Sequence, residues 1–403
     1  MNILVFNCGS SSQGFKVYRT GPGQPESVLI SGKAKNVAIR TRAEAYIRWE
    51  INGSTVEKEC PLGSHRTAAE RILEILRAQN IRPDAIGHRF VHGGRLLQKN
   101  VRINAETREL LRQALPLAPI HNPNSFSVIE VCEEHLPGVP QFAVFDTVFH
   151  AGMPEASGTY ALPADLAEQF GFRKYGFHGL SCQYVSGEVA RLMGKPLPEL
   201  KLIICHLGSG GSSVTAVQAG KTLDTSMGYS PLAGLVMSTR CGDLDPEIIL
   251  ELTRAGYPSE RISEILNRES GLLGLSGFSS SLTEIIEASE EGNPSCRAAY
   301  DVYVHRLKKY LGAFYWLLNG ADAILFTDDV GETCWKMRER VFAGAEFLGI
   351  RLDTERNRAA DGKCPQLISR EDSSVQLWVV PTDEERVILR AVETLLGNPD
   401  PEQ

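Results

Sequence analysis

The sequence predicts an α/β protein made of two duplicated lobes, each a β-sheet flanked by helices. The length of 403 residues exceeds the about 100–200 residues that are typical of one domain. An opening pattern of apolar strand, Gly/Ser turn and return strand recurs about half the chain later, with the two turns at 7–12 and 206–211. We therefore expect the two lobes to begin with equivalent hairpins.

Short apolar or alternating runs predict strands, and apolar residues at helical spacing predict helices. In the first half we expect helices over 70–79 and 105–115, and strands over 3–6, 15–18, 27–37, 45–51, 86–91 and 141–145. The second half opens with strands 202–206 and 214–217, and later has strands 323–327, followed by a turn at Gly331, and 376–380. Its remaining pattern is helical, over 246–255, 259–267, 282–288, 298–318, 333–347 and 383–396.

Composition excludes several classes of protein. The net charge is −7 and no Lys/Arg-rich run stands out, so we expect no nucleic-acid partner, whereas a small anionic substrate fits if positive charge is gathered locally. The apolar runs are far shorter than the ~18 residues of a membrane span, and no signal peptide is visible. Nine cysteines without a C-x-x-C pair argue against a disulfide framework and a zinc site. A cytoplasmic protein is the expectation.

The two Gly/Ser turns are candidates for phosphate binding. Small residues let backbone N–H groups approach a ligand closely, and serine hydroxyls add donors. A lone turn of this kind is usually only a tight turn, but two at matching positions favour a phosphate chain held between the lobes. A P-loop is disfavoured because the motif G-x-x-x-x-G-K-[ST] is absent.

Several single residues stand in places that suit chemistry. Arg89 interrupts an apolar strand, Arg240 lies in a turn before a helix, and Asp146 ends a strand. For each of these three residues, a structural ion pair is at least as good an explanation as a role in a functional site. His121 and His178 lie in Gly/Pro-rich contexts that can hold an imidazole rigidly, whereas a structural role is expected for His88, His135, His150 and His305.

Nine segments in order resemble the acetate kinase family, from the first strand to the last helix. They include NCGSSS, HRFVHGG, PIHNP and YGFHGLS, and together they occupy 7–12, 88–94, 119–123, 144–147, 175–181, 206–208, 224–228, 270–277 and 381–385.

This resemblance implies duplicated ribonuclease-H-like domains of the actin-like ATPase type, with mixed β-sheets flanked by helices and the active site in the interdomain cleft. The N-terminal lobe would be 1–147, joined by the C-terminal helix 381–403, and the C-terminal lobe 148–380 would carry the nucleotide-side motifs. The implied reaction is reversible phosphoryl transfer from ATP to acetate or a similar short-chain carboxylate, giving an acyl phosphate such as acetyl phosphate. Mg²⁺ or Mn²⁺ would be the cofactor, and a homodimer through the C-terminal lobe is implied.

The resemblance also assigns roles. The catalytic residues would be Asp146, His178, Arg240 and Arg89, and the metal and phosphate would be supported by Asn7 and Glu384. Arg89 and His121 would orient the substrate, in an acyl pocket of Val91, Ile120, Phe177 and Pro231. Nucleotide and phosphate contacts would come from Ser10, Ser12, His206, Leu207, Gly208, Ser209, Gly210, Ser281, Leu282, Thr283, Asp329, Val330, Gly331, Glu332 and Thr333.

The chain departs from the family pattern on the phosphoryl-donor side. The family has Lys where this chain has Gly14, Asp-x-Arg at 281–283, and two glycines where this chain has Asp328 and Asp329. Fewer cations and more carboxylates make such a pocket less attractive to a polyphosphate, and the two aspartates are expected to intrude. Lys16, on the same strand face as residue 14, is a candidate substitute.

Three hypotheses follow. The first is a working carboxylate kinase that uses ATP, another nucleotide or pyrophosphate. The second is a catalytically silent homologue that binds acyl phosphate as a sensor. The third, a serine hydrolase using Ser10 or Ser12, is disfavoured because no G-x-S-x-G elbow is present. The sequence does not choose the acyl chain length, since one methylene is worth only ~1–3 kcal/mol in a pocket.

Overall fold

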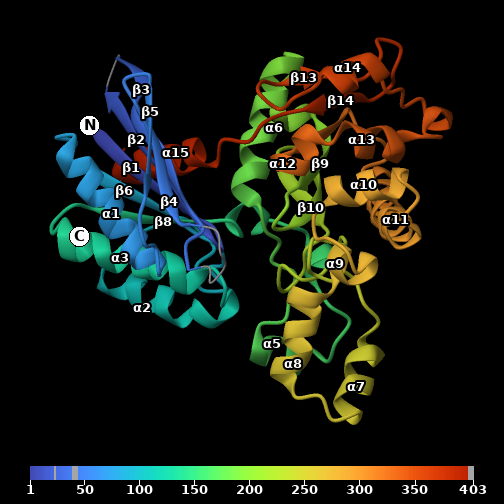
Figure 1. Ribbon diagram of the computed structural model, residues 1–403, viewed down its shortest axis with the longest axis horizontal. Helices are drawn as coiled ribbons and strands as arrows, with labels where there is room; N and C mark the ends of the chain where they lie inside the picture. Colours follow the sequence, from blue (N-terminus) through green and yellow to red (C-terminus); the bar gives the residue numbers. More distant parts are fainter. Residues whose placement is uncertain (22–23, 39–43, 398–403) are drawn as a thin grey trace. The chain divides into compact units, whose positions relative to one another are not determined.

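The computed structural model describes residues 1–21, 24–38 and 44–397 (Figure 1). The chain forms two compact units. Unit 1 comprises Met1–Val148 and Asp383–Gln403, and unit 2 comprises Phe149–Thr382. Each unit contains its own β-sheet.

Unit 1 is built on a mixed eight-stranded sheet with the strand order β5-β4-β3-β2-β1-β6-β8-β7. Strands β1 to β5 form an antiparallel meander, β6 and β8 run parallel to β1, and β7 is antiparallel to β8. The strands are β1 (Asn2–Cys8), β2 (Ser12–Gly21), β3 (Gln24–Lys35), β4 (Tyr46–Ile51), β5 (Ser54–Glu59), β6 (Ala85–Phe90), β7 (Val101–Arg102) and β8 (Gln141–Phe145).

In the described part of unit 1, the sheet is accompanied by the α-helices α1 (His65–Ala78), α2 (Ala105–Gln113), α3 (Asn122–His135) and α15 (Glu384–Gly397). Helices α1 and α3 lie side by side (Figure 1), and both contribute to a core shared with Leu4 and Phe6 of β1. Helix α15 contacts β1 and β6. It approaches closely because β6 has Gly87 at the contact, where a Cβ would meet Ile388 Cγ2 at 2.6 Å.

Unit 2 is built on a six-stranded sheet with the order β11-β10-β9-β12-β14-β13. The strands are β9 (Lys201–Leu207), β10 (Ser212–Gln218), β11 (Lys221–Thr225), β12 (Ala323–Thr327), β13 (Gln366–Leu367) and β14 (Gln376–Val379). The α-helices are α4 (Glu155–Gly158), α5 (Ala164–Phe170), α6 (Gly179–Met193), α7 (Pro246–Arg254), α8 (Ser259–Glu264), α9 (Gly271–Ser276), α10 (Leu282–Glu290), α11 (Pro294–Leu317), α12 (Asp328–Thr333), α13 (Trp335–Phe342) and α14 (Thr354–Ala359).

The predicted duplication is confirmed by topology and register. The order β3-β2-β1-β6-β8 in unit 1 matches β11-β10-β9-β12-β14 in unit 2, with the same parallel and antiparallel neighbours. Asn7 pairs with Gly14 across the first hairpin, and His206 pairs with Ser213 across the second. Two helices pack on the sheet of the other half of the sequence. Helix α6 comes after β8 in the chain but packs on β9 and β12 of unit 2, and α15 comes after β14 but packs on β1 and β6 of unit 1.

Some elements differ from the sequence expectations. The turn expected at Gly331 is helix α12, which starts directly after β12 and is followed by α13. The helix expected over 333–347 ends at Phe342, because Gly344 has φ +81° and breaks the helical path. Strand β5, all of whose residues are exposed, and helices α3 and α6 were not predicted. An exposed strand has no apolar alternation, and α3 is too evenly apolar for a clear periodicity.

Within the described ranges, every helix is too short or too polar to cross a bilayer. All nine cysteines have free thiols, and five of them are buried.

Candidate active site

In unit 1, four elements bring charged residues together around Arg89. Strands β1, β6 and β8 are parallel, so their carboxyl ends lie at one edge of the sheet, where ligands commonly bind in α/β folds. Arg89 Nε donates to Asp146 Oδ1 at 2.8 Å and its Nη2 donates to Asp146 Oδ2 at 2.6 Å. The third nitrogen, Nη1, donates to Asn7 Oδ1 at 3.0 Å and lies 3.3 Å from Glu384 Oε2.

The Arg89–Asp146 pair is bidentate and largely removed from water, since the exposed fractions of the two side chains are 15% and 1%. Burial opposes the charge of Arg89, but the carboxylates of Asp146, Glu384 and Glu385 outweigh it and raise the pKa of the guanidinium above its ordinary value. Arg89 is therefore a permanent cation that is fully occupied by protein groups.

Asn7 links this pair to the start of α15. Its Nδ2 donates to Glu384 Oε2 and to Glu385 Oε1, both at 3.0 Å. Gly14 lies opposite Asn7, and a Cβ at Gly14 would stand 3.3 Å from Glu385 Oε1. Lys16 Nζ lies 3.4 Å from Asp383 Oδ1 and 4.0 Å from Glu385 Oε2, so this lysine is paired with the same acidic segment.

The oxygen donors of Asn7 and Glu384 fit a hard divalent cation such as Mg²⁺. Among the residues that the structure describes, no group of three or more His, Cys, Asp or Glu side chains could hold a metal ion by itself. Mg²⁺ commonly takes one or two protein oxygens and completes its shell with water and substrate phosphates, which is the arrangement this donor set fits.

The segment after β6 is tied to the start of α3. Asn122 accepts from the backbone N–H of His92 at 3.2 Å and donates to the His92 carbonyl at 3.0 Å. His121 is the residue just before α3, next to Ile120, whose exposed fraction is 38%, whereas Val91 is buried. Sequence reasoning missed Asn122, although an Asn-Pro pair at a helix start is a recognisable signal.

Ser10 lies in the turn between β1 and β2, and Ser12 is the first residue of β2. This turn closes through the Gly9 N–H, which donates to the Ser12 carbonyl at 2.8 Å. His65 was also missed by sequence reasoning. It is buried at the start of α1, and its Nε2 bonds the Gly9 carbonyl at 3.0 Å. Burial lowers the pKa of His65, so a neutral imidazole supports the turn.

In unit 2, His178 and His206 stack beside the second Gly/Ser turn. Their ring centroids are 4.0 Å apart and the rings are inclined by 24°. His178 Nδ1 bonds Ser213 Oγ at 2.9 Å, and His206 Nδ1 bonds Ser181 Oγ at 2.9 Å. His178 has φ 60°, a left-handed conformation that is unusual outside glycine, and α6 begins at the next residue.

Arg240 lies against the same turn. A Cβ at Gly211 would stand 3.2 Å from Arg240 Nη1 and 3.6 Å from His178 Nε2, so the turn, the guanidinium and the imidazole lie close together. Arg240 Nη1 donates to the Pro231 carbonyl at 3.1 Å. Burial lowers the pKa of Arg240, and no described residue offers it a carboxylate within 4 Å. A cation in this state suits an incoming anion.

Two aspartates reach the turn from the end of β12. Asp328 Oδ2 lies 3.1 Å from His206 Nε2, and Asp329 Oδ1 accepts from the Ser209 N–H at 2.7 Å and from the Val330 N–H at 2.8 Å. Asp328 has φ 64°, where a glycine would be unstrained. A carboxylate thus occupies a backbone donor that a phosphate oxygen would use.

Glu332 connects this helix to the end of the unit. Its Oε1 accepts from the Asp328 N–H at 2.8 Å and from the Thr382 N–H at 3.3 Å. Burial raises the pKa of Glu332, although these two hydrogen bonds favour the charged form. Gly331 and Val330 lie in the same short helix, and Thr333 Oγ1 donates to the Asp329 carbonyl at 2.6 Å.

Four further predicted residues lie in unit 2. Ser281 caps α10 by accepting from the Glu284 N–H at 3.4 Å, Leu282 belongs to the hydrophobic core and Thr283 is exposed. Phe177 is buried, and its carbonyl bonds His150 Nε2 at 2.9 Å. The structural role expected for His150 is thereby confirmed.

Each unit therefore gathers part of the predicted site. Unit 1 brings together Asn7, Arg89, Asp146 and Glu384, and unit 2 brings together His178, His206, Arg240 and the turn at 208–211. The meeting of Arg89 with Arg240 and His178 in one crevice stays a prediction.

Comparison with known proteins points to one family. Residues 2–390 match the sequence profile of the Acetokinase family. The chain is 44% identical to an acetate kinase of Dictyoglomus turgidum over 98% of each chain. Among solved structures, it resembles an acetate kinase of Entamoeba histolytica with a TM-score of 0.88 and 39% identity, covering 98% of this chain and 100% of that one. It also resembles a propionate kinase of Francisella tularensis with a TM-score of 0.87 and 34% identity, covering 97% and 98%.

Proposed function

The chain belongs to the acetokinase family, and from this membership we propose that it transfers a phosphoryl group reversibly from ATP to acetate or a similar short-chain carboxylate. The product is an acyl phosphate. The relatives that support this are named acetate kinase and propionate kinase, so both acyl groups belong to the proposal. Nothing in the comparisons supports the sensor or the serine hydrolase hypothesis.

One observation carries the proposal: a guanidinium without a carboxylate partner among the described residues, Arg240, lies beside His178 and a Gly/Ser turn. Phosphoryl transfer passes through a loose transition state whose charge is spread over the equatorial oxygens, so a protein mainly supplies cations, donors and alignment. Arg240 and His178 supply a cation and a donor. A carboxylate acceptor is already ionised at neutral pH and needs no strong general base.

The hydrogen bonds of Arg89 support a role in the reaction that differs from the role of Arg240. All three of its guanidinium nitrogens are engaged by Asp146, Asn7 or Glu384. In the proposed mechanism, Arg89 orders these acidic groups and presents positive charge, whereas Arg240 takes the oxygens of the acceptor carboxylate and of the transferring group. Asp146 holds Arg89 in one orientation.

Mg²⁺ would be held on the side of Asn7 and Glu384, and when bound it neutralises charge on the donor phosphates. The N–H groups of the turn at 206–210 would hold those phosphates, together with Ser10 and Ser12. Pro231, Val91, Ile120 and Phe177 would form the acyl pocket, with His121 orienting the carboxylate.

The donor is ATP in this proposal, with pyrophosphate or another nucleotide as the second candidate. The observation that favours the second candidate is the pair Asp328 and Asp329, whose carboxylates contact His206 and the Ser209 N–H. A carboxylate on the turn disfavours a phosphate group at the same backbone N–H. The two candidate substrates also differ because ATP needs space for its nucleoside, whereas pyrophosphate does not.

The experiment is a steady-state assay of acyl phosphate formation, with acetate, propionate and butyrate against ATP, GTP and pyrophosphate. Arg240→Ala is expected to lower kcat/KM for the preferred carboxylate by roughly 10²–10³-fold, the usual effect of removing one transition-state donor. The matched control is Arg351→Ala, since Arg351 is an exposed arginine that pairs with Asp372 in the same unit. Equal activity of the Arg240→Ala variant and the wild type would overturn the proposal.

A homodimer and a cytoplasmic location also belong to the proposal. Unit 2 exposes a group of large apolar side chains near and on α7: Leu244, Ile248, Ile249, Leu250 and Tyr257. Exposed apolar patches of this kind commonly mark protein interfaces. Light scattering should give twice the chain mass, and Ile248→Glu should shift it toward the monomer. The nine free thiols fit a reducing compartment.

A further inference from the structure

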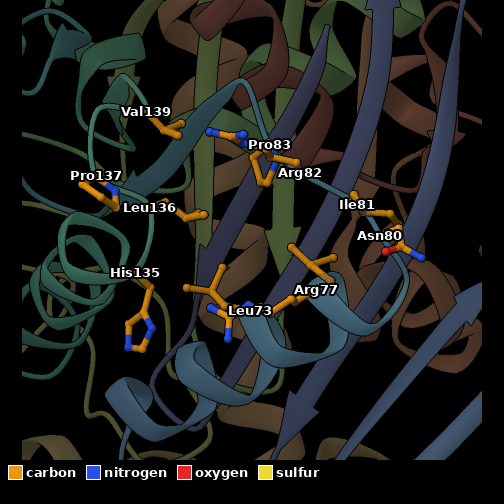
Figure 2. A pocket seen from close by; sticks show the side chains of 11 residues that line it. Leu73, Arg77, Asn80, Ile81, Arg82, Pro83, His135, Leu136, Pro137 and Val139 are labelled. Carbon is orange, nitrogen blue, oxygen red and sulfur yellow. The ribbon is translucent and has the colours of Figure 1, made fainter.

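Unit 1 contains a cavity of about 470 Å³ that no step of the proposed reaction uses. It lies at the C-terminal ends of α1 and α3 and is lined by the last residues of both helices and the segments that follow them. Figure 2 shows its lining, which includes Arg77, Asn80, Arg82, His135, Leu136 and Val139. Its volume is in the range of small-molecule sites.

The cavity is lined by both apolar and polar surface, and its polar part includes basic residues. Leu73 and Leu76 are buried against the core of the unit, and Leu136 and Val139 pack on it. The side chains of Arg77, Arg82 and His135 stand around these apolar groups (Figure 2), and no acidic residue belongs to the lining. In a chain of net charge −7, this is a local gathering of positive charge.

The two arginines lack the ion pairs that most exposed arginines of this chain make. Arg71, on the same helix, pairs with Glu74 at 2.8 Å, and Arg66 pairs with Glu70 and Glu134. For Arg77 and Arg82, no carboxylate of the described residues lies within 4 Å of the guanidinium. Their charges are therefore available to an anion from solution.

Several backbone carbonyls at the two helix ends are engaged by nearby N–H groups. After α1, Asn80 adopts φ 55°, and the N–H groups of Asn80 and Ile81 donate to the carbonyls of Arg77 and Leu76 at 3.0 and 2.9 Å. After α3, the Leu136 N–H donates to the Cys132 carbonyl at 2.9 Å. The carbonyls of Leu76, Arg77 and Cys132 therefore have hydrogen-bond partners within the unit.

The cavity lies at the opposite ends of the strands from the Arg89 cluster. The segment that lines it is anchored to the first residue of β1, because Asn2 Nδ2 donates to the Arg82 carbonyl at 3.1 Å and the Asp84 N–H donates to the Asn2 carbonyl at 2.8 Å. Asn7 lies at the other end of β1, about 17 Å away at the usual rise of a strand. The cavity is thus separate from the acidic cluster.

We propose that this cavity is a second ligand site that binds an amphipathic carboxylate, with its aliphatic body against Leu136 and Val139 and its carboxylate held by Arg77 and Arg82. Guanidinium groups recognise carboxylate oxygens through paired N–H donors, and the apolar walls take the chain. This inference does not rest on the proposed function, because it concerns binding at residues outside the proposed site.

The test is calorimetric titration of the full chain with octanoate, in the presence of saturating acetate so that the proposed acyl pocket is occupied. Binding should strengthen roughly fifteenfold from hexanoate to octanoate, since each of the two added methylenes is worth about fourfold in affinity when buried. The variant carrying Arg77→Gln and Arg82→Gln should bind octanoate at least tenfold more weakly and 1-octanol within twofold of the wild type. Arg71→Gln, a change at a paired arginine of the same helix outside the cavity, should bind like the wild type.

A second variant works in the opposite sense. Asn80→Asp places a carboxylate in the lining at a left-handed position that Asp tolerates, and it should weaken octanoate binding without unfolding the chain. Absence of octanoate binding to the wild type would overturn the proposal. Equal binding by the doubly substituted variant and Arg71→Gln would overturn it as well, because the anion would then lie elsewhere.

Discussion

The carboxylate of Asp329 accepts a hydrogen bond from the backbone N–H of Ser209 at 2.7 Å, across 120 residues of sequence. The acceptor lies at the start of α12 and the donor in the turn between β9 and β10. An internal anion therefore sits on the turn that the proposal assigns to the phosphates of the donor. The strength of donor binding should respond to this one side chain.

Asp329→Ala and Asp329→Asn separate the charge from the occupancy of the turn. Replacing the carboxylate by a methyl group leaves the Ser209 N–H available and removes one negative charge from the turn. The KM for ATP should therefore fall about threefold to tenfold in the Ala variant. The Asn variant keeps an oxygen that can accept from the Ser209 N–H, so its change in KM should report the effect of the charge alone. Glu371→Gln, at an exposed residue of the same unit, is the control in the steady-state assay. A KM for ATP that stays the same or rises in both variants would show that Asp329 does not limit donor binding.

Gly210 and Gly211 form a matched pair in the same turn. A Cβ at Gly211 meets Arg240 Nη1 at 3.2 Å, whereas one at Gly210 meets no atom within 4 Å. Gly211→Ala should displace the guanidinium by a few tenths of an ångström and lower kcat/KM for the carboxylate about tenfold, because transfer depends on alignment. Gly210→Ala should keep wild-type kinetics, and both variants should unfold at the wild-type temperature. Identical kinetics for the two would mean that Arg240 takes no part in the reaction.

Asp146 holds Arg89 by two hydrogen bonds, and removing it leaves a cation short of its main partner. Asp146→Ala should lower the free energy of unfolding by about 2–4 kcal/mol, as expected when one member of a largely buried ion pair is lost. It should also lower kcat at least 100-fold, since Arg89 is then free to reorient. Asp146→Asn keeps the shape and should fold more stably than the Ala variant while remaining slow. Denaturant unfolding and initial rates check both points, and wild-type kcat in the Ala variant would contradict the positioning role.

The burial of His88 predicts that the free energy of unfolding depends on pH. It is buried, its Nε2 bonds Gln141 Oε1 at 2.7 Å and its ring stacks on Phe6. Burial lowers the pKa of His88 from 6.5 to about 4. Between these values the unfolded chain binds a proton that the folded chain does not, so the free energy of unfolding rises with pH over this window and falls on acidification.

The resulting loss from pH 7 to pH 5 is about 2 kcal/mol for this one group. His88→Gln removes the titration, so its unfolding free energy should fall by less over the same interval. His135→Gln, at an exposed histidine, should keep the wild-type difference. Urea titrations of the three proteins at pH 5 and pH 7 provide the measurement. An unchanged difference in the His88→Gln variant would show that other groups cause the acid sensitivity.

Much of the fold could be predicted because its elements carry local signals. The buried strands β1, β6, β9 and β12 are short apolar runs, and the repeat of strand, Gly/Ser turn and strand indicated the duplication. Helix α3 was not predicted because its apolar residues show no clear helical periodicity, and α6 was not predicted because it begins within the Gly-rich segment 175–181, which is typical of a turn. Helix α12 escaped because six residues with two adjacent aspartates give no periodicity.

Four candidate residues could be found from the sequence: Arg89, Asp146, Arg240 and His178. Each lies in or beside an apolar run or in a Gly-rich turn, where burying a polar or charged group costs free energy unless it is paired or functional. Their partners could not be found from the sequence. That Asn7 contacts Glu384 depends on the packing of α15 against β1, and that Asp329 contacts Ser209 depends on the adjacency of β12 and β9.

The sequence by itself determined the α/β class, the duplication and the residues that can carry charge, because these follow from local spacing and from the composition of each segment. Only the tertiary structure decided which carboxylate occupies Arg89, that Arg240 lies without one among the described residues, and that Arg77 and Arg82 border one cavity. Hydrogen bonds and ion pairs form over a few ångströms, and distances of that size between residues far apart in the chain are set by how helices and strands pack.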